Sequence, residues 1–144
     1  MARKPRILFV CTGNSARSQM AEGFTRYYAG STAIVDSAGT DPVGINPYAK
    51  WAMNEAGIDI DGQTSDALAE MDLSSFDYVI TLCGDARDRC PAIPPDIRTE
   101  HWDLPDPAGV RGRPSDVIQA FRVIRFEIER RVRDLLTRIL QPQS

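Results

Sequence analysis

The sequence predicts a single α/β domain in three layers, a four-stranded parallel sheet flanked by helices. Short apolar runs typical of buried strands alternate with longer segments of helical character, and this alternation is typical of a parallel sheet. The chain has 144 residues, a length that suits one domain with one substantial core. It contains no internal repeat and no low-complexity segment. We therefore expect residues 1–144 to form one domain.

The first part of the chain predicts two strands and the helix between them. Residues 7–10, Ile-Leu-Phe-Val, form an apolar run typical of a buried strand. A helix is expected over residues 18–29, where Gly30 ends it. The second predicted strand covers residues 33–38 and is closed by Gly39.

The middle of the chain predicts a helix that begins with good capping residues. Asn46 suits the N-cap and Pro47 suits the first helical position, so the helix is expected to continue over residues 48–56. Residues 64–66, Thr-Ser-Asp, are then expected to cap a short helix that extends to Met71.

Two further strands complete the predicted sheet. Residues 76–82 are rich in β-branched and aromatic side chains, and residues 97–102 are a candidate fourth strand. Ligands of such sheets bind at the carboxyl ends of the strands. Cys11 and Cys83 both fall at such ends, so this edge is the expected site.

The last predicted helix begins at Pro114 and Ser115 and has one apolar stripe. Its apolar residues recur every three or four positions: Val117, Phe121, Ile124, Ile128, Val132, Leu135 and Ile139. Six arginines lie mostly off this stripe: Arg122, Arg125, Arg130, Arg131, Arg133 and Arg138. We interpret them as a solvated face with Glu127 and Glu129 as partners, in preference to an anion-binding face.

Composition excludes several classes of function. The net charge of -3 argues against a general nucleic-acid surface, which would need a basic field. The apolar runs are far shorter than the roughly 20 residues that cross a bilayer, and the N-terminus lacks a signal-peptide pattern. We therefore expect a cytoplasmic protein with no membrane and no nucleic-acid partner. Three cysteines are too few for a disulfide framework, so they are candidates for catalysis or redox chemistry.

The segment after the first strand predicts an oxyanion site. Residues 11–18 (Cys-Thr-Gly-Asn-Ser-Ala-Arg-Ser) connect a strand to a helix, and such a turn directs several backbone N–H groups at one point. These dipoles and Arg17 favour the thiolate of Cys11, a good nucleophile, and Arg17 can bind two oxygens of a tetrahedral oxyanion. The alternative interpretation of Cys11 is a small buried hydrophobe.

Residues 11–18 resemble the phosphate-binding loop of low-molecular-weight protein tyrosine phosphatases, and still more that of thioredoxin-coupled arsenate reductases of the same fold. Residues 19–23 (Gln-Met-Ala-Glu-Gly), 79–86, 90–91, and 100–102 followed by 106–108 also match the reductases. The resemblance covers nearly the whole chain in order. It implies the low-molecular-weight tyrosine phosphatase-like fold and reduction of arsenate to arsenite for arsenic detoxification.

The resemblance also implies a role for each of five residues. The Cys11 thiolate attacks arsenic, Arg17 binds the oxyanion and Asp106 protonates the leaving oxygen. Cys83 then attacks the Cys11 sulfur, and Cys90 attacks Cys83, so that oxidation ends as a Cys83–Cys90 disulfide that thioredoxin reduces. The alternative for Cys83 and Cys90 is that they are bystanders, and Asp106 in an Asp-Pro pair can simply form a turn.

Two other functions remain open. A phosphatase of this fold, hydrolysing phosphomonoesters, needs only the first cysteine, and arsenate and phosphate are both tetrahedral oxyanions. An oxyanion-binding or thiol-sensing module would use the cysteines without catalysis. The remaining loop residues are expected to bind the oxyanion or support the loop: Thr12, Gly13, Asn14, Ser15, Ala16 and Ser18. Asn14 tolerates a left-handed backbone, and Ser18 is expected to donate to the Cys11 sulfur.

No tightly bound cofactor is expected. His101 is the only histidine, which argues against a histidine-based metal site. Some of the reductases that this chain resembles bind a potassium ion near the loop. The resemblance implies that the corresponding residues here are Asn14, Glu22, Thr64 and Asp66. Residues 64–66 serve equally well as a helix cap. The expected partners are arsenate or similar oxyanions and thioredoxin, and the expected state is a monomer.

Overall fold

A parallel four-stranded sheet is the centre of the molecule. The computed structural model describes residues 3–82 and 93–140. The strands are β1 (Arg6–Cys11), β2 (Ile34–Gly39), β3 (Tyr78–Thr81) and β4 (Arg98–His101), and they lie in the order β2-β1-β3-β4. All three neighbouring pairs are parallel, so the predicted sheet is confirmed. Cys11 lies at the carboxyl end of the central strand β1, where its Cα pairs with that of Gly39.

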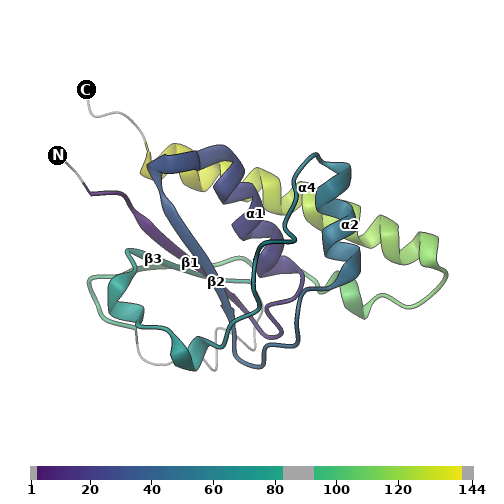
Figure 1. Ribbon diagram of the computed structural model, residues 1–144, viewed down its shortest axis with the longest axis horizontal. Helices are drawn as coiled ribbons and strands as arrows, with labels where there is room; N and C mark the ends of the chain where they lie inside the picture. Colours follow the sequence, from purple (N-terminus) through teal and green to yellow (C-terminus); the bar gives the residue numbers. More distant parts are fainter. Residues whose placement is uncertain (1–2, 83–92, 141–144) are drawn as a thin grey trace.

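Three helices pack against one face of this sheet. They are α1 (Arg17–Ala29), α2 (Pro47–Glu55) and the long α4 (Pro114–Ile139). Figure 1 shows these helices together on one side, with the short 3-10 turns η2 (Leu68–Glu70) and η3 (Leu73–Ser75) on the other side. The fully buried side chains that join sheet and helices include Phe9, Met20, Phe24, Met53, Phe121 and Ile128. The core is one cluster of buried side chains from the sheet and the helix layer, and it also includes Leu68 of η2 on the other side.

The predicted helices occur with small shifts, but the short helix after residue 64 is wrong. Leu68–Glu70 forms a single 3-10 turn whose N-cap, Ala67, has extended backbone and no capping side chain. The reason is that this segment pairs with the end of β2: the Gly39 N–H donates to the Asp66 carbonyl at 2.8 Å, and Gly39 and Ala67 form a parallel bridge. Residues 64–66 are thereby held against the strand ends instead of starting a helix.

The last two strands are shorter than predicted. Phe76 ends the turn η3, with its N–H donating to the Leu73 carbonyl at 3.1 Å, so β3 begins only at Tyr78. In β4 the ladder with β3 covers four residues, and Ile97 and Trp102 lie outside it.

The apolar stripe of α4 is confirmed, but one of its arginines is not solvated. Phe121, Ile124, Ile128, Val132 and Leu135 are buried, whereas Arg125 is also only 8% exposed. Arg125 Nη1 donates to the Ala52 carbonyl at 2.9 Å and to Glu55 Oε1 at 2.7 Å.

Of the two acidic residues predicted to pair with the arginines of α4, one does so in the structure. Glu127 accepts from Arg130 and Arg131, as expected for a solvated face. Glu129 accepts instead from the hydroxyl of Tyr28 on α1 at 2.5 Å. The arginines of α4 therefore bind neighbouring helices as well as solvent.

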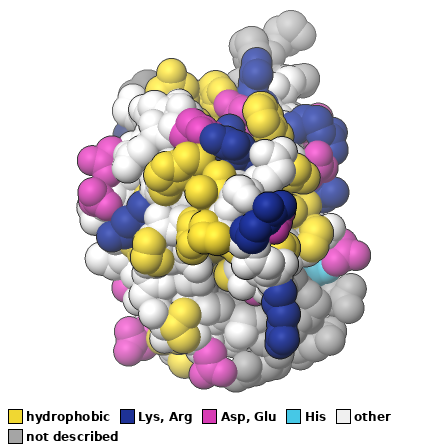
Figure 2. Space-filling model, turned by 90° about the vertical axis from the view of Figure 1, so that its right-hand side faces the viewer, with side chains coloured by type: hydrophobic (Ala, Val, Ile, Leu, Met, Phe, Trp, Pro, Cys, Tyr) yellow, Lys and Arg dark blue, Asp and Glu magenta, His cyan; other side chains and the backbone are white. Residues whose placement is uncertain are grey.

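One end of the molecule exposes hydrophobic side chains. Figure 2 shows them gathered in the middle of the face formed by the right-hand side of Figure 1, with Lys and Arg side chains around them. The exposed large hydrophobic residues of the described chain include Val43, Trp51 of α2, and Val123 and Phe126 of α4. No helix among the described residues combines the length and the hydropathy that crossing a membrane requires.

Candidate active site

The loop between β1 and α1 turns its carbonyl groups outward. The Thr12, Gly13 and Ser15 carbonyls accept from the N–H groups of residues 41, 43 and 46 at 2.8, 3.0 and 2.9 Å. In a planar trans peptide the next N–H points opposite to the carbonyl. The N–H groups of residues 13, 14 and 16 therefore face the concave side of the loop. This is the geometry of a nest for an anion.

Cys11 lies where the strand meets this loop. Its side chain is buried, and its Sγ lies 2.9 Å from the hydroxyl oxygen of Ser18 in the first turns of α1. Ser18 Oγ in turn donates to Asn14 Oδ1 at 2.7 Å. The predicted Cys11–Ser18 contact is thus present, with Asn14 as a second acceptor for the same hydroxyl.

Arg17 joins the loop to the segment after β4. Its Nη1 donates to the carbonyls of Leu104 at 2.8 Å and Leu82 at 3.4 Å. Its Nη2 lies 3.8 Å from Asp106 Oδ2, and its side chain is only 11% exposed. The guanidinium is therefore held at the mouth of the loop by groups from two strand ends.

Asp106 both forms a turn and faces the site. Its Oδ1 accepts from the Ala108 N–H at 3.0 Å and so caps the 3-10 turn η4 (Pro107–Gly109). Its other oxygen is the one near Arg17. The carboxyl group is half exposed to solvent. The turn and the acid interpretations of Asp106 are compatible.

Asn14 has the left-handed backbone that the sequence predicts, with φ of 44°. The side chains that stabilise this backbone conformation could not be predicted from the sequence. The buried Gln19 donates from Nε2 to the Asn14 carbonyl at 3.0 Å, and Ser65 Oγ donates to the same carbonyl at 3.0 Å. Gly39 is also tight against the loop, because a Cβ there would lie 2.6 Å from the Thr12 oxygen. The only available signal was that Gln19 is a polar residue on a helix face turned to the core.

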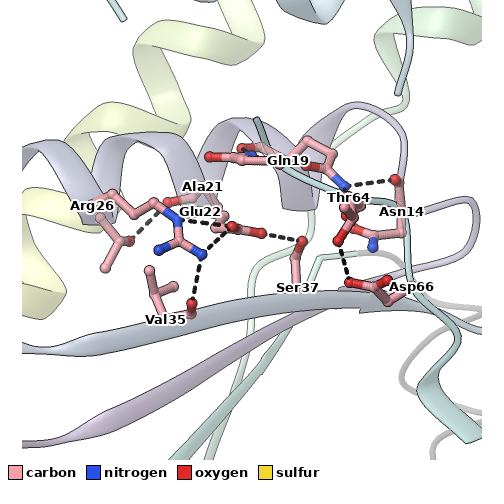
Figure 3. A network of polar contacts seen from close by, with 11 residues as sticks. Asn14, Gln19, Ala21, Glu22, Arg26, Val35, Ser37, Thr64 and Asp66 are labelled. Carbon is pink, nitrogen blue, oxygen red and sulfur yellow. Dashed lines mark hydrogen bonds and ion pairs between the residues drawn. The ribbon is translucent and has the colours of Figure 1, made fainter. Parts of the chain in front are cut away.

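The four residues expected to bind potassium are already engaged with protein groups. Glu22 accepts from Ser37 at 2.6 Å through one oxygen and from Arg26 at 2.6 and 2.9 Å through the other (Figure 3). Thr64 donates to Asp66 at 2.7 Å. Burial raises the pKa of Glu22, whereas its hydrogen bonds from Ser37 and Arg26 act in the opposite direction. The guanidinium of Arg26 thus supplies a positive charge to Glu22, the more buried of the two carboxylates among the expected ligands.

Cys83 and Cys90 lie outside the described residues. Within residues 3–82 and 93–140, no three His, Cys, Asp or Glu side chains are grouped as for a metal ion. His101 Nδ1 lies 2.8 Å from Thr81 Oγ1 and bridges β4 to β3. Among the described residues that the sequence predicts to be catalytic, Cys11 lies beside Ser18, and Arg17 lies beside Asp106.

The fold and the site define a class of protein, the parallel α/β proteins in which the loop between the first strand and the first helix begins with a thiol. Residues 6–144 match the low molecular weight phosphotyrosine protein phosphatase family. The arsenate reductase of Bacillus subtilis is 48% identical over 128 residues, which are 89% of this chain and 92% of that protein. The chain therefore belongs to the low molecular weight phosphotyrosine protein phosphatase family, with arsenate reductases among its close relatives.

Solved structures agree with this assignment. An arsenate reductase in a phosphate-binding state is 36% identical with a TM-score of 0.79, and the match covers 94% of this chain and 98% of that one. A thioredoxin-dependent arsenate reductase from Corynebacterium glutamicum is 33% identical with a TM-score of 0.79 and covers 99% of this chain. The match spans 65% of that longer chain.

Proposed function

We propose that this protein reduces arsenate to arsenite, with thioredoxin as the final reductant. The observation that carries the proposal is the position of the Cys11 sulfur at the end of β1, 2.9 Å from the hydroxyl of Ser18, in a loop that turns its carbonyl groups outward and ends at Arg17. The identity to arsenate reductases supports arsenate over other tetrahedral oxyanions as the substrate. We further propose that the protein is cytoplasmic and monomeric. Gel filtration with light scattering tests the monomeric state.

The first step is attack of the Cys11 thiolate on arsenic. The loop N–H groups and Arg17 bind the oxygens and stabilise the charge that develops on them. A sulfur–arsenic bond forms, an arsenic–oxygen bond breaks, and Asp106 gives its proton to the departing oxygen, which leaves as water. Arsenic remains pentavalent at this stage.

The second step is the reduction itself. In the proposed relay the Cys83 thiolate attacks the Cys11 sulfur, the sulfur–arsenic electron pair goes to arsenic, and arsenite leaves. Cys90 then attacks Cys83 and frees Cys11, which leaves a Cys83–Cys90 disulfide. A thioredoxin dithiol reduces this disulfide, so two electrons pass from thioredoxin to arsenic in each cycle.

Arsenate-dependent NADPH consumption with thioredoxin and thioredoxin reductase tests the proposal. The intact chain should consume NADPH well above a blank without arsenate. The Cys90→Ser variant should release about one arsenite per molecule and then stop, because its disulfide cannot pass to thioredoxin. NADPH consumption at the blank rate by the intact chain would refute the proposed function.

A phosphatase of the same site is the second candidate. The observation in its favour is that Cys11, Arg17 and Asp106 are arranged as an oxyanion-binding thiol with an acid, a set that does not depend on further cysteines. Hydrolysis of p-nitrophenyl phosphate measures this activity. Phosphatase turnover unaffected by Cys90→Ser, together with no arsenite production, would favour this candidate.

We propose that potassium binds only weakly at Asn14, Glu22, Thr64 and Asp66, because Arg26 already neutralises Glu22. Replacing choline chloride with KCl at equal ionic strength should change the melting temperature and kcat/KM little. The Arg26→Gln variant, which leaves Glu22 without its cation, should instead gain a potassium-dependent rise in melting temperature. A strong potassium effect on the unmodified protein would contradict this proposal.

A further inference from the structure

The hydroxyl of Ser65 joins two segments of the chain behind the loop between β1 and α1. Its Oγ donates to the Asn14 carbonyl oxygen at 3.0 Å and lies 3.3 Å from the Gly13 carbonyl oxygen. The same Oγ accepts from the Gly44 N–H at 3.2 Å. A serine hydroxyl has one proton to donate and lone pairs that accept, so both uses are compatible. Ser65 thus ties the loop to the segment of residues 40–46.

The residues on both sides of Ser65 are bound to elements of the fold. The Gly39 N–H at the end of β2 donates to the Asp66 carbonyl at 2.8 Å. The Gln19 side chain of α1 donates from Nε2 to the Thr64 carbonyl at 2.9 Å. The hydroxyl of Ser65 is therefore held at a fixed place relative to the sheet and to α1.

The two carbonyl groups near Ser65 belong to consecutive peptide units. In a planar trans peptide the N–H of the next residue points opposite to the carbonyl. Because the Gly13 and Asn14 carbonyls are turned toward Ser65, the N–H groups of residues 14 and 15 point to the concave side of the loop. Consecutive N–H groups that converge in this way form a nest for an anion. Ser65 therefore lies directly behind a pair of N–H groups that are placed to bind an oxyanion.

The second of these peptide units depends on side chains for its orientation. The Asn14 backbone is left-handed, with φ of 44°, a conformation that is unfavourable for residues with a Cβ. The Gly13 carbonyl accepts from a backbone group, the Val43 N–H, at 3.0 Å. The donors to the Asn14 carbonyl are instead two side chains, Gln19 and Ser65, each at 3.0 Å. Ser65 thus supplies one of two bonds that keep the peptide after Asn14 turned outward.

We propose that Ser65 is a positioning residue for the oxyanion, because its hydroxyl holds the N–H groups of residues 14 and 15 in the direction that a tetrahedral oxyanion requires. The proposal rests on the proposed function, in which arsenate binds in this loop. Ser65 acts from the convex side of the loop, through the backbone. It therefore determines how tightly the oxyanion binds and leaves the reacting groups, Cys11 and Arg17, in place.

Phosphate binding by the Ser65→Ala variant tests the proposal. Isothermal titration calorimetry with inorganic phosphate measures Kd, and circular dichroism in the same buffer shows that the variant is folded. We expect Kd to rise by about three- to tenfold, the effect of one lost hydrogen bond. An unchanged Kd in the folded variant would overturn the proposal.

Steady-state kinetics supply a second measurement on the same variant. The loop N–H groups bind the oxygens of arsenate both before and during the attack, so their misalignment weakens the two states alike. KM for arsenate in the NADPH assay should therefore rise by about the same factor as Kd, and kcat should change less than about twofold. A fall in kcat with KM unchanged would contradict a positioning role.

Two further variants separate positioning from a merely structural effect. Ser65→Thr keeps the hydroxyl and should bind phosphate as the unmodified protein does, whereas binding as weak as that of Ser65→Ala would overturn the proposal. Thr25→Val is the matched control, because it removes a buried hydroxyl of α1 that donates to the Ala21 carbonyl at 2.8 Å. It should leave Kd for phosphate unchanged. A rise in Kd equal to that of Ser65→Ala would show a general effect of stability and refute the role of Ser65.

The failure of this proposal is distinguishable from the failure of the proposed function. Phosphate binding needs neither electron transfer nor thioredoxin. An intact chain that binds phosphate but consumes no NADPH with arsenate would refute the proposed function and leave the role of Ser65 in oxyanion binding standing. An intact chain that is an active reductase, with Kd and KM unaffected by Ser65→Ala, would refute only the role of Ser65. An intact chain that binds no phosphate would overturn both.

Discussion

Gly39 is the residue whose replacement should most directly disturb the loop between β1 and α1. A Cβ at this position would lie 2.6 Å from the Thr12 oxygen and 2.9 Å from the Asn14 nitrogen, both backbone atoms of the loop. We expect Gly39→Ala to destabilise the fold by about 1–3 kcal/mol, as overpacking does, and to raise KM for arsenate about tenfold or more. Thermal unfolding and the NADPH assay measure the two effects. Gly62→Ala is the matched control, since a Cβ there meets nothing within 4 Å.

A single substitution at Asp106 can separate its proposed role as a proton donor from its role in capping the turn η4. In the Asp106→Asn variant the new side chain could still accept from the Ala108 N–H, because asparagine caps turns as well as aspartate does. It could not give a proton to the leaving oxygen. Asp106→Asn should therefore keep the melting temperature and lower kcat by roughly 100-fold or more, measured as the rate of arsenite release in a single turnover. Full activity in this variant would exclude Asp106 as the acid.

At the scale of elements, the contact between α2 and α4 depends on a pair of arginines around Glu55. Arg122 Nη2 lies 2.8 Å from Glu55 Oε2, and Arg125 Nη1 lies 2.7 Å from Oε1. Hydrogen bonds from Arg122 and Arg125 lower the pKa of Glu55 to about 2. Arg125 is buried, whereas Arg122 is more than a third exposed.

The burial difference predicts unequal costs for the two arginines. Arg125→Met should cost about 1–3 kcal/mol, because the Ala52 carbonyl and Glu55 Oε1 each lose a hydrogen bond from a buried guanidinium. The Ala56 N–H at 3.3 Å and Arg122 Nε at 3.0 Å remain as their donors. Arg122→Met should cost less than Arg125→Met, because an exposed ion pair is screened by solvent and contributes little to stability. Urea unfolding of the two variants measures the difference. Equal losses would show that the burial of Arg125 does not matter.

The lowered pKa of Glu55 determines how the stability contributed by its ion pairs changes with pH. The pKa of Glu55 is lower in the folded protein than its ordinary value of 4.5, so its ion pairs stabilise the fold fully above about pH 4.5. That contribution is lost as pH falls toward the folded-state pKa of about 2. Glu55→Gln should therefore be less stable than the unmodified protein near neutral pH, and the difference should shrink between pH 4.5 and 2. A difference constant with pH would contradict the role given to Glu55.

Helices and strands that are determined by a local sequence pattern could be predicted. Segments whose conformation depends on pairing with a distant part of the chain could not. The helix α4 follows from its own apolar period, and β1 from its own apolar run. Thr64–Asp66 have good capping side chains, but their backbone pairs with the end of β2 and no helix starts there. Arg125 looked solvated because a sequence shows charge but not the carbonyl of Ala52 that accepts from it.

The site divides in the same way. Cys11, Arg17 and Ser18 could be identified because they belong to one short segment with a recognisable order of residue types. The partners of that segment come from distant parts of the chain: Gly39, Gln63, Ser65 and Leu104. Nothing local marks these residues, because their roles depend on how the strands are ordered in the sheet.

At the scale of the whole molecule, the site is assembled from the ends of all four strands. The loop follows β1, Gly39 ends β2, the Leu82 carbonyl follows β3, and the Leu104 carbonyl follows β4. These groups meet only when the complete sheet is formed in the order β2-β1-β3-β4. An oxyanion bound at this site, as proposed, would therefore bind the folded state and would have no equivalent site in the unfolded chain.

This dependence predicts that a tetrahedral oxyanion stabilises the entire fold. At 100 times its Kd, phosphate should add about 2.7 kcal/mol to the free energy of unfolding, which for a chain of this size is a rise of about 5–10 °C in melting temperature. Chloride at matched ionic strength should not reproduce the effect, because it cannot present several oxygens to the nest and to Arg17. The Arg17→Gln variant should lose most of the stabilisation while still unfolding cooperatively. Equal stabilisation by phosphate with and without Arg17 would show that the anion binds elsewhere on the molecule.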